Sequence, residues 1–98
     1  TGDYVFVGYC MGNEGKAIEE QIDGAFTTLE TRLSKVGLNL ESVVKMDCLF
    51  EDINDLNLLP EIIKKRFNGK YPVRKAFTSK FLRTGIKFQL DAIACRKH

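Results

Sequence analysis

The chain has 98 residues, of which 44% are hydrophobic and 29% charged, and its formal net charge is only +2. These values are typical of one globular domain covering residues 1–98, and they exclude disorder and low complexity. No apolar run approaches the ~20 residues that a membrane-spanning helix needs, and the start at Thr1 rather than Met predicts that an amino-terminal piece is missing.

A strand and a long helix are predicted first. Residues 4–7 are β-forming residues that end at Gly8, and residues 9–11 extend the strand in one reading. Residues 16–36 predict an amphipathic helix, because apolar side chains recur at helical spacing, namely Ile18, Ile22, Ala25, Phe26, Leu29, Leu33 and Val36. Gly37 is the predicted stop of this helix. Since only one side is apolar, the helix is expected to lie on a sheet.

The middle of the chain predicts a second strand and a second helix. Alternation in residues 43–50 separates two faces, one with Val44, Met46, Cys48 and Phe50 and the other with Lys45 and Asp47. Residues 51–55 read as a polar turn. A helix is predicted at residues 58–67, with Asn57 as its cap, Pro60 in its first turn and residues 68–69 as its end.

Residues 71–95 predict two further strands joined by a turn. Pro72 marks a strand start, one of the few sheet positions that proline tolerates. Residues 75–82 alternate loosely, and Gly85 ends a turn in which it is free to take a positive φ. Residues 86–92 alternate strictly between apolar and polar side chains, and this last strand continues to Cys95.

The resulting order is β-α-β-α-β-β, for which two helices on one face of a mixed sheet is the economical packing. Both βαβ crossovers are expected to be right-handed and to give locally parallel pairs, and the last two strands to form an antiparallel hairpin. The uncovered face is expected to carry Lys45, Asp47, Gln89 and Asp91. Such a face is polar enough to meet water and mixed enough to meet another subunit.

One stretch of the chain resembles a known family. Pro72-Val73-Arg74, Leu82 and the strand at 87–94, which ends Ala-Ile-Ala, are similar to the carboxy-terminal signature of the YjgF/Rid family of reactive-intermediate imine deaminases. Some members of that family are labelled endoribonuclease L-PSP. The resemblance implies an α+β, chorismate-mutase-like (YjgF/L-PSP-like) fold and homotrimers with ligand clefts between subunits. It also implies one more amino-terminal strand than this chain contains.

The resemblance further implies roles for four residues. Arg74 matches the arginine that holds the substrate carboxylate, a task that suits a planar and always charged guanidinium. Gln89 stands where the family has a water-handling glutamate, and an amide orients a water but cannot take its proton. Tyr9 and Ala76 match two further substrate-binding positions, where the family has a glycine and a cysteine.

The implied function is hydrolysis of 2-imino or 2-enamino acid intermediates to 2-keto acids, weakened by Gln89. One alternative is a non-enzymatic member of the family that binds a small metabolite or a protein. Another is RNA cleavage of the endoribonuclease L-PSP type. Charge is relevant to the RNA alternative, because residues 1–49 hold 8 acids and 4 bases whereas residues 50–98 hold 5 acids and 11 bases. An anionic ligand, a solvated face or complementary subunit surfaces would each explain that asymmetry.

Cysteine and histidine usage limits the remaining chemistry. Cys10, Cys48 and Cys95 are widely spaced, which predicts reduced structural thiols in an intracellular compartment, cytoplasmic with mitochondrial as the alternative. The single histidine, His98, offers neither a triad nor a metal set, so no metal and no cofactor are expected. The expected partners are other copies of the chain and a small carboxylate metabolite, with RNA as the alternative and no membrane.

Overall fold

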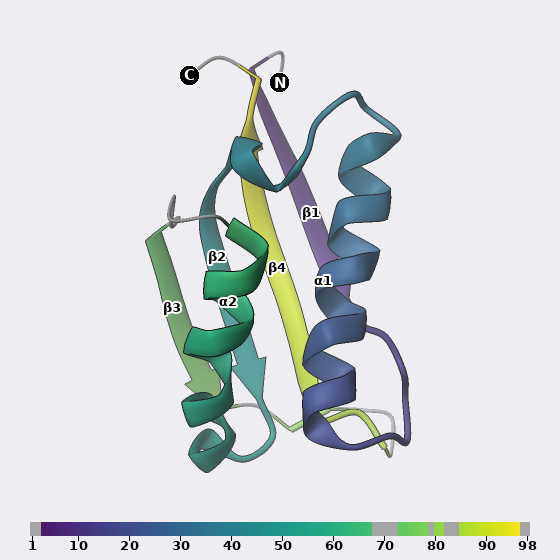
Figure 1. The fold of residues 1–98 in the computed structure, drawn as a ribbon, viewed down its shortest axis with the longest axis vertical. Coiled ribbons are helices and arrows are strands. Elements are labelled where there is room, and N and C mark those ends of the chain that lie inside the picture. Colours follow the sequence, from purple (N-terminus) through teal and green to yellow (C-terminus); the bar gives the residue numbers. More distant parts are fainter. Residues whose placement is uncertain (1–2, 68–72, 79, 82–84, 97–98) are drawn as a thin grey trace.

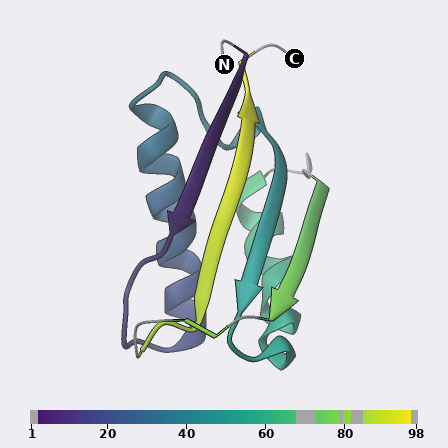
Figure 2. The same ribbon diagram turned by 180° about the vertical axis from the view of Figure 1, so that it is seen from behind.

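Two helices pack on one face of a four-stranded sheet in the computed structural model, which describes residues 3–67, 73–78, 80–81 and 85–96 (Figure 1). The strands are β1 (Tyr4–Cys10), β2 (Val43–Phe50), β3 (Val73–Thr78) and β4 (Phe88–Cys95), and the helices are α1 (Ile18–Ser34) and α2 (Leu59–Phe67). Figure 2 shows the opposite side, where the sheet is uncovered. The predicted α+β architecture with both helices on one face is confirmed.

The strand order is β1-β4-β2-β3, so the predicted hairpin of the last two strands is wrong. β4 instead enters the middle of the sheet and pairs antiparallel with β1 on one side and β2 on the other. Before it does so, the chain passes the end of β2, where the Glu51 N–H donates to the Lys87 carbonyl at 3.0 Å. The helix-facing side chains of β4, Phe88, Leu90, Ala92 and Ala94, are all buried, which suits a central strand.

Only one of the two predicted parallel pairs exists. β2 and β3, joined through α2, pair in parallel as expected. β1 and β2, joined through α1, both run antiparallel to β4, which lies between them. The first crossover therefore skips one strand position, which the periodicity of the sequence cannot predict.

The strand β2 starts with an irregularity that turns Val44 away from the face predicted for it. The pairing register with β4 shifts between Val43 and Lys45, and a bulge of this kind moves the following side chains to the other face. As a result Val43 is buried and Val44 is 40% exposed. The remaining prediction for this strand is confirmed, since Met46, Cys48 and Phe50 are buried beneath the helices.

The helix ends follow local backbone chemistry. α1 begins at Ile18 after Ala17, which makes no side-chain cap, and ends at Ser34 before Gly37, whose φ of 76° confirms the predicted stop. Val36, placed in the apolar stripe from the sequence, lies beyond the helix and is exposed. The predicted cap of α2 is wrong, because a 3₁₀ helix at Ile53–Leu58 runs straight into α2 and contains Asn57.

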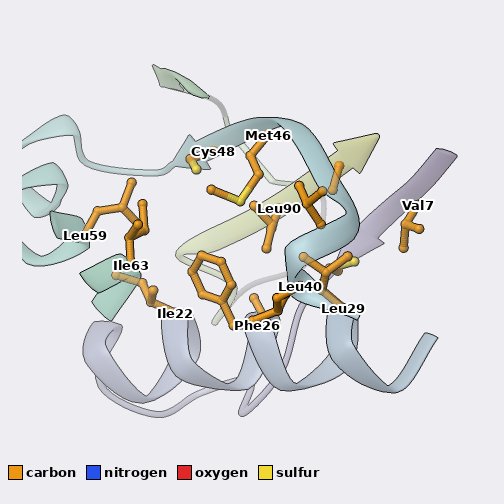
Figure 3. Packing of buried hydrophobic residues seen from close by; sticks show 14 of the residues in the cluster. Val7, Ile22, Phe26, Leu29, Leu40, Met46, Cys48, Leu59, Ile63 and Leu90 are labelled. Atoms are coloured by element: carbon orange, nitrogen blue, oxygen red, sulfur yellow. The ribbon is translucent and has the colours of Figure 1, made fainter. Parts of the chain in front are cut away.

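The core lies between the helices and the covered face of the sheet. Figure 3 shows Phe26 and Leu29 of α1 reaching toward Met46 and Leu90 of the sheet. Phe26 also meets the Phe67 ring of α2 edge to face, with 6.0 Å between ring centroids. Burying one side chain of this size contributes about 1.5–3 kcal/mol, so this layer supplies most of the driving force for folding.

One fully buried polar side chain ties α1 to the segment that leads into β4. Gln21 is 1% exposed, and its Nε2 donates to the carbonyls of Lys16 and Gly85 at 3.0 and 2.7 Å, while its Oε1 accepts from the Lys87 N–H at 2.8 Å. Gly85 has a φ of 91°, which confirms its predicted turn conformation. The entry to the central strand is therefore fixed from the helix.

Close backbone contact fixes the loop that precedes α1. A Cβ added to Gly12 would lie 2.7 Å from the backbone carbon and oxygen of Gly24. Glycine at position 12 is therefore required by contact with the helix rather than by backbone dihedral angles.

Several sequence predictions lie outside the described residues. These are the strand start at Pro72, the helix end at 68–69, Leu82, the turn residues 83–84 and His98. Within the described ranges, no helix is both long and apolar enough to cross a membrane.

Candidate functional site

Arg74 lies beside a hollow of about 430 Å³ at the edge of the sheet. The residues that line this Arg74 hollow come from β3, the 3₁₀ helix and the start of α2, and they are Leu56, Asn57, Leu59, Pro60, Arg74, Lys75 and Ala76. Arg74 is paired with Met46 on β2 and Ala76 with Cys48, which places both on the helix-covered side. Because β3 is an edge strand, the Arg74 side chain still remains exposed.

The Arg74 hollow combines apolar and charged lining residues. The apolar side chains are those of Leu56, Leu59, Pro60 and Ala76, and Arg74 lies among the lining residues together with Lys75 and Asn57. A guanidinium is able to hold a carboxylate through two parallel hydrogen bonds. An apolar wall next to such a fork favours a ligand with one carboxylate and a short hydrocarbon part.

Burial disfavours the thiolate form of the cysteines near the predicted site residues. Cys48, the neighbour of Ala76 on β2, is buried, and burial raises the pKa of its thiol to about 12 although nearby Arg74 lowers it. Burial likewise raises the pKa of Cys10, with Arg32 acting in the opposite direction. All three cysteines are buried and none forms a disulfide, as predicted for reduced structural thiols.

A second group of predicted residues lies on the uncovered face of the sheet. Gln89 is half-buried there, and its Nε2 donates to Oδ1 of Asp91 at 3.3 Å. The same Oδ1 accepts the Tyr9 backbone N–H at 2.9 Å. These three residues, Tyr9, Gln89 and Asp91, are called the Asp91 cluster below. Tyr9 and Gln89 are site residues predicted from the sequence, and Asp91 forms a hydrogen bond with each of them.

Tyr9 belongs to a bulge in β1. The register between β1 and β4 shifts between Val7 and Cys10, and Tyr9 has a φ of 55°, which costs a non-glycine residue about 1–3 kcal/mol. From the side opposite Asp91, Arg32 Nη1 of α1 donates to the Gly8 carbonyl at 2.5 Å. The bulge is thus held from two elements, and it leaves Tyr9 72% exposed.

The Arg74 hollow and the Asp91 cluster lie on opposite faces of the sheet. Arg74 is in register with buried Met46, whereas Gln89 is in register with Leu49 on the uncovered face. β2 separates the two strands that carry them. The structure therefore brings Arg74 to Ala76 and Tyr9 near Gln89, but one copy of the chain does not bring all four predicted residues together.

Comparison with known proteins decides the family. A family model described as endoribonuclease L-PSP matches residues 7–96. The chain belongs to this family. A solved structure of a Streptococcus pyogenes protein, described as a member of the yjgF family, superposes with a TM-score of 0.94 at 46% identity, covering 98% of this chain and 82% of that one. The YjgF/Rid resemblance of residues 72–94 is thereby confirmed.

Two curated relatives of this L-PSP family chain carry an enzymatic name. A human protein named 2-iminobutanoate/2-iminopropanoate deaminase is 31% identical over 77 residues, and the rat protein of the same name is 34% identical over the same length. Each match covers 79% of this chain and 56% of the relative. The chain thus spans little more than half the length of these relatives.

Sequence reasoning about this L-PSP family chain missed the residues that surround its predicted site. Most of the aliphatic side chains in the Arg74 hollow come from the 3₁₀ helix and α2. From the sequence, these segments are predicted only as a polar turn and a core helix. The sequence predicts Asp91 on the uncovered face but gives no role for it. Its position two residues after Gln89 indicates that the two side chains are neighbours, because residues i and i+2 of a strand point to the same side.

The uncovered face also contains exposed aromatic side chains and a carboxylate oxygen without a hydrogen-bond partner among the described residues. Tyr4, Phe6 and Phe77 are exposed aromatic residues, and Phe6 is 73% exposed. Asp47, opposite Asp91 in the sheet, has an Oδ1 that is shielded from solvent and has no hydrogen-bond partner among the described residues. The described residues contain no group of three or more His, Cys, Asp or Glu side chains that would hold a metal ion.

Proposed function

We propose that this chain hydrolyses 2-imino or 2-enamino acids to 2-keto acids and ammonia, with the substrate carboxylate held by Arg74. The observation that carries the proposal is that Arg74 and several aliphatic side chains line one hollow of about 430 Å³. The names of the human and rat relatives support the reaction class. The hydrocarbon part of the substrate lies against Ala76, Leu56 and Leu59 in this proposal.

The reaction needs few groups from the protein. Water adds across the C=N bond, its oxygen forming a bond to carbon and its proton passing to nitrogen. The hydroxyl proton of the resulting carbinolamine then passes to nitrogen, C=O forms, and the C–N bond breaks to release ammonia. Gln89 orients the attacking water through a hydrogen bond but takes no proton, since an amide is not a base near neutral pH. Turnover is therefore slower than with a glutamate at position 89.

The two halves of the site meet only between copies of the chain. Arg74 and Gln89 face opposite sides of one sheet, so a substrate that contacts both needs a second subunit. A homotrimer, in which each uncovered face meets a neighbour, would also cover the exposed aromatic rings of Tyr4 and Phe6. Size-exclusion chromatography with light scattering tests this part, and a monomer at micromolar concentration would contradict it.

The carboxylate role of Arg74 is tested by substitution. 2-Iminobutanoate and 2-iminopropanoate are generated in situ from the amino acids by an amino-acid oxidase, and keto-acid appearance is compared with the spontaneous rate. Arg74→Ala should lower kcat/KM by at least tenfold, because a lost charged hydrogen bond costs about 1.5–3 kcal/mol. Lys64→Ala, which removes an exposed cation of α2 outside the hollow, is the matched control.

The outcomes separate the candidate functions. Wild-type turnover that does not exceed the spontaneous rate would remove the deaminase proposal. Binding of a 2-keto acid that Arg74→Ala abolishes would then leave a non-enzymatic binding protein of the same family. Gln89→Glu supplies a proton acceptor and should raise kcat. An unchanged kcat in Gln89→Glu would show that water activation does not limit the reaction.

RNA cleavage is a second candidate, favoured by the description of the matching family and by the basic second half of the chain. Contacts to phosphates would make the activity fall steeply with added salt. Cleavage of a single-stranded RNA that co-elutes with the protein and falls with salt would favour this candidate. Cleavage that separates from the protein on purification would exclude it.

A further inference from the structure

Asp91 is the point at which two site candidates from different strands meet. Its Oδ1 accepts the Tyr9 backbone N–H at 2.9 Å from the β1 bulge and the Gln89 side-chain amide at 3.3 Å from β4. The same oxygen lies 3.8 Å from the place where a Cβ of Gly8 would stand. One carboxylate oxygen therefore contacts both the bulge and the proposed water-orienting group.

The conformation of Tyr9 depends on contacts of this kind. A tyrosine with a φ of 55° adopts a backbone conformation that favours glycine, and such strain persists only where surrounding contacts hold it. Asp91 binds the N–H of Tyr9, and Arg32 binds the carbonyl just before it. The peptide unit between Gly8 and Tyr9 is thus fixed at both its polar atoms.

The orientation of Gln89 follows from the same hydrogen bond. A glutamine amide has a donor end and an acceptor end. Asp91 accepts one of the two N–H groups of Nε2, which sets the direction of the amide and leaves Oε1 as its acceptor for a water. An acceptor is what a glutamate would present at this position, which means that the orientation imposed by Asp91 lets an amide replace a carboxylate in holding water.

We propose that Asp91 is a positioning residue: it stabilises the Tyr9 bulge and turns the Gln89 amide so that its carbonyl oxygen faces the attacking water. The inference rests on the proposed imine hydrolysis for its catalytic consequence. Its structural part, one carboxylate that organises Tyr9 and Gln89 together, stands without that activity. Tests of the two parts therefore have different readouts.

The structural part is tested by amide exchange and a double-mutant cycle. The Tyr9 N–H should exchange slowly in the wild type and about tenfold or more faster in Asp91→Ala, whereas Asp91→Asn, which keeps an acceptor oxygen, should retain most of the protection. Tyr9→Gly adopts the positive φ without help. Because only a tyrosine releases strain when the bulge relaxes, the change that Asp91→Ala causes in the unfolding constant should be at least as large in the Tyr9→Gly background.

The catalytic part is tested by measuring kcat and KM separately for the wild type and the Asp91 variants. Asp91→Ala should lower kcat roughly tenfold while KM stays within about twofold, because Arg74 on the other face still holds the carboxylate. Asp91→Asn should restore kcat to within about threefold of wild type. If Asp91→Ala fails to fold, the wild type still decides, since rapid exchange of the Tyr9 N–H would overturn the proposal.

The possible results are distinct. No wild-type turnover with slow Tyr9 exchange overturns the proposed function and supports the structural role of Asp91. Wild-type turnover with an unchanged kcat in folded Asp91→Ala overturns the catalytic part and leaves the deaminase intact. An unfolding constant that Asp91→Ala leaves unchanged, with Tyr or with Gly at position 9, overturns the claim that Asp91 stabilises the bulge.

Discussion

Arg66 joins the two helices through both ion pairs found among the described residues. It lies in the last turn of α2, and only 19% of its side chain is exposed. Its Nη2 and Nη1 reach Asp23 Oδ1 and Glu30 Oε1 of α1 at 2.7 and 2.6 Å, and its guanidinium stands 5.8 Å from the centroid of the Phe26 ring. Burial acts to lower the pKa of Arg66, but the hydrogen bonds to both carboxylates outweigh it and raise the pKa.

The expected loss follows from these contacts. Asp23 and Glu30 are 63% and 46% exposed, so each pair contributes only about 0.2–1 kcal/mol, and the cation–π contact adds about 0.5–1 kcal/mol. Arg66→Met keeps the aliphatic stem and removes the charge. We therefore expect it to lower the free energy of unfolding by about 1–3 kcal/mol.

Urea denaturation at fixed protein concentration measures this loss, because assembly would make stability depend on concentration. The matched control is Lys65→Met, which removes the adjacent, exposed cation that makes no ion pair with a described residue. The control should stay within about 0.5 kcal/mol of wild type. In 1 M NaCl, the deficit of Arg66→Met should shrink, since the Debye length there is about 3 Å.

Either of two results would refute this role of Arg66. Equal free energies of unfolding for Arg66→Met and Lys65→Met would mean that the bridge between the helices contributes nothing. A deficit that persists in full at 1 M NaCl would assign the effect to packing of the stem rather than to charge.

Three further predictions concern stability. Because the pKa of Cys48 is raised to about 12, only the thiol of the unfolded chain ionises between pH ~9 and ~12, and the free energy of unfolding falls as the pH rises through this range. In chemical denaturation, Cys48→Ala should reduce this fall by up to about 1.4 kcal/mol per pH unit. Gln21→Leu leaves buried backbone groups unpaired and should cost about 2–4 kcal/mol in urea unfolding. Gln21→Glu should cost at least as much, because it buries a carboxylate whose oxygen faces the carbonyls of Lys16 and Gly85. Gly12→Ala forces a Cβ against the backbone of Gly24 and should cost about 1–3 kcal/mol, but Gly8→Ala, with only a 3.8 Å contact, should cost less than 1 kcal/mol by the same assay.

Local patterns in the sequence predicted the elements well. The stripe from Ile22 to Leu33 identifies the inward side of α1, because a helix repeats every 3.6 residues and exposes only one apolar face. Alternation predicted that Gln89 and Asp91 share the uncovered face, because it depends on neighbours along the chain alone. The turn glycines Gly37 and Gly85 were predicted for the same reason.

The candidate site was only half predictable. The family signature identified Arg74 and Gln89, yet nothing in their spacing shows that they face opposite sides of the sheet. The bulge at Tyr9 and its bond to Asp91 join residues 82 positions apart in the chain. No periodic signal carries such a contact, since it depends on which strands become neighbours.

The sequence by itself determined most of the secondary structure and of the inward faces, and its signature at residues 72–94 indicated the family. The tertiary structure alone decided that β4 lies between β1 and β2, where the sequence predicted a hairpin with β3. The physical reason is that alternation specifies which side of a strand is buried but not which strand lies beside it. Pairing is settled by long-range hydrogen bonds and packing, and these place Arg74 and Asp91 on opposite faces of one sheet.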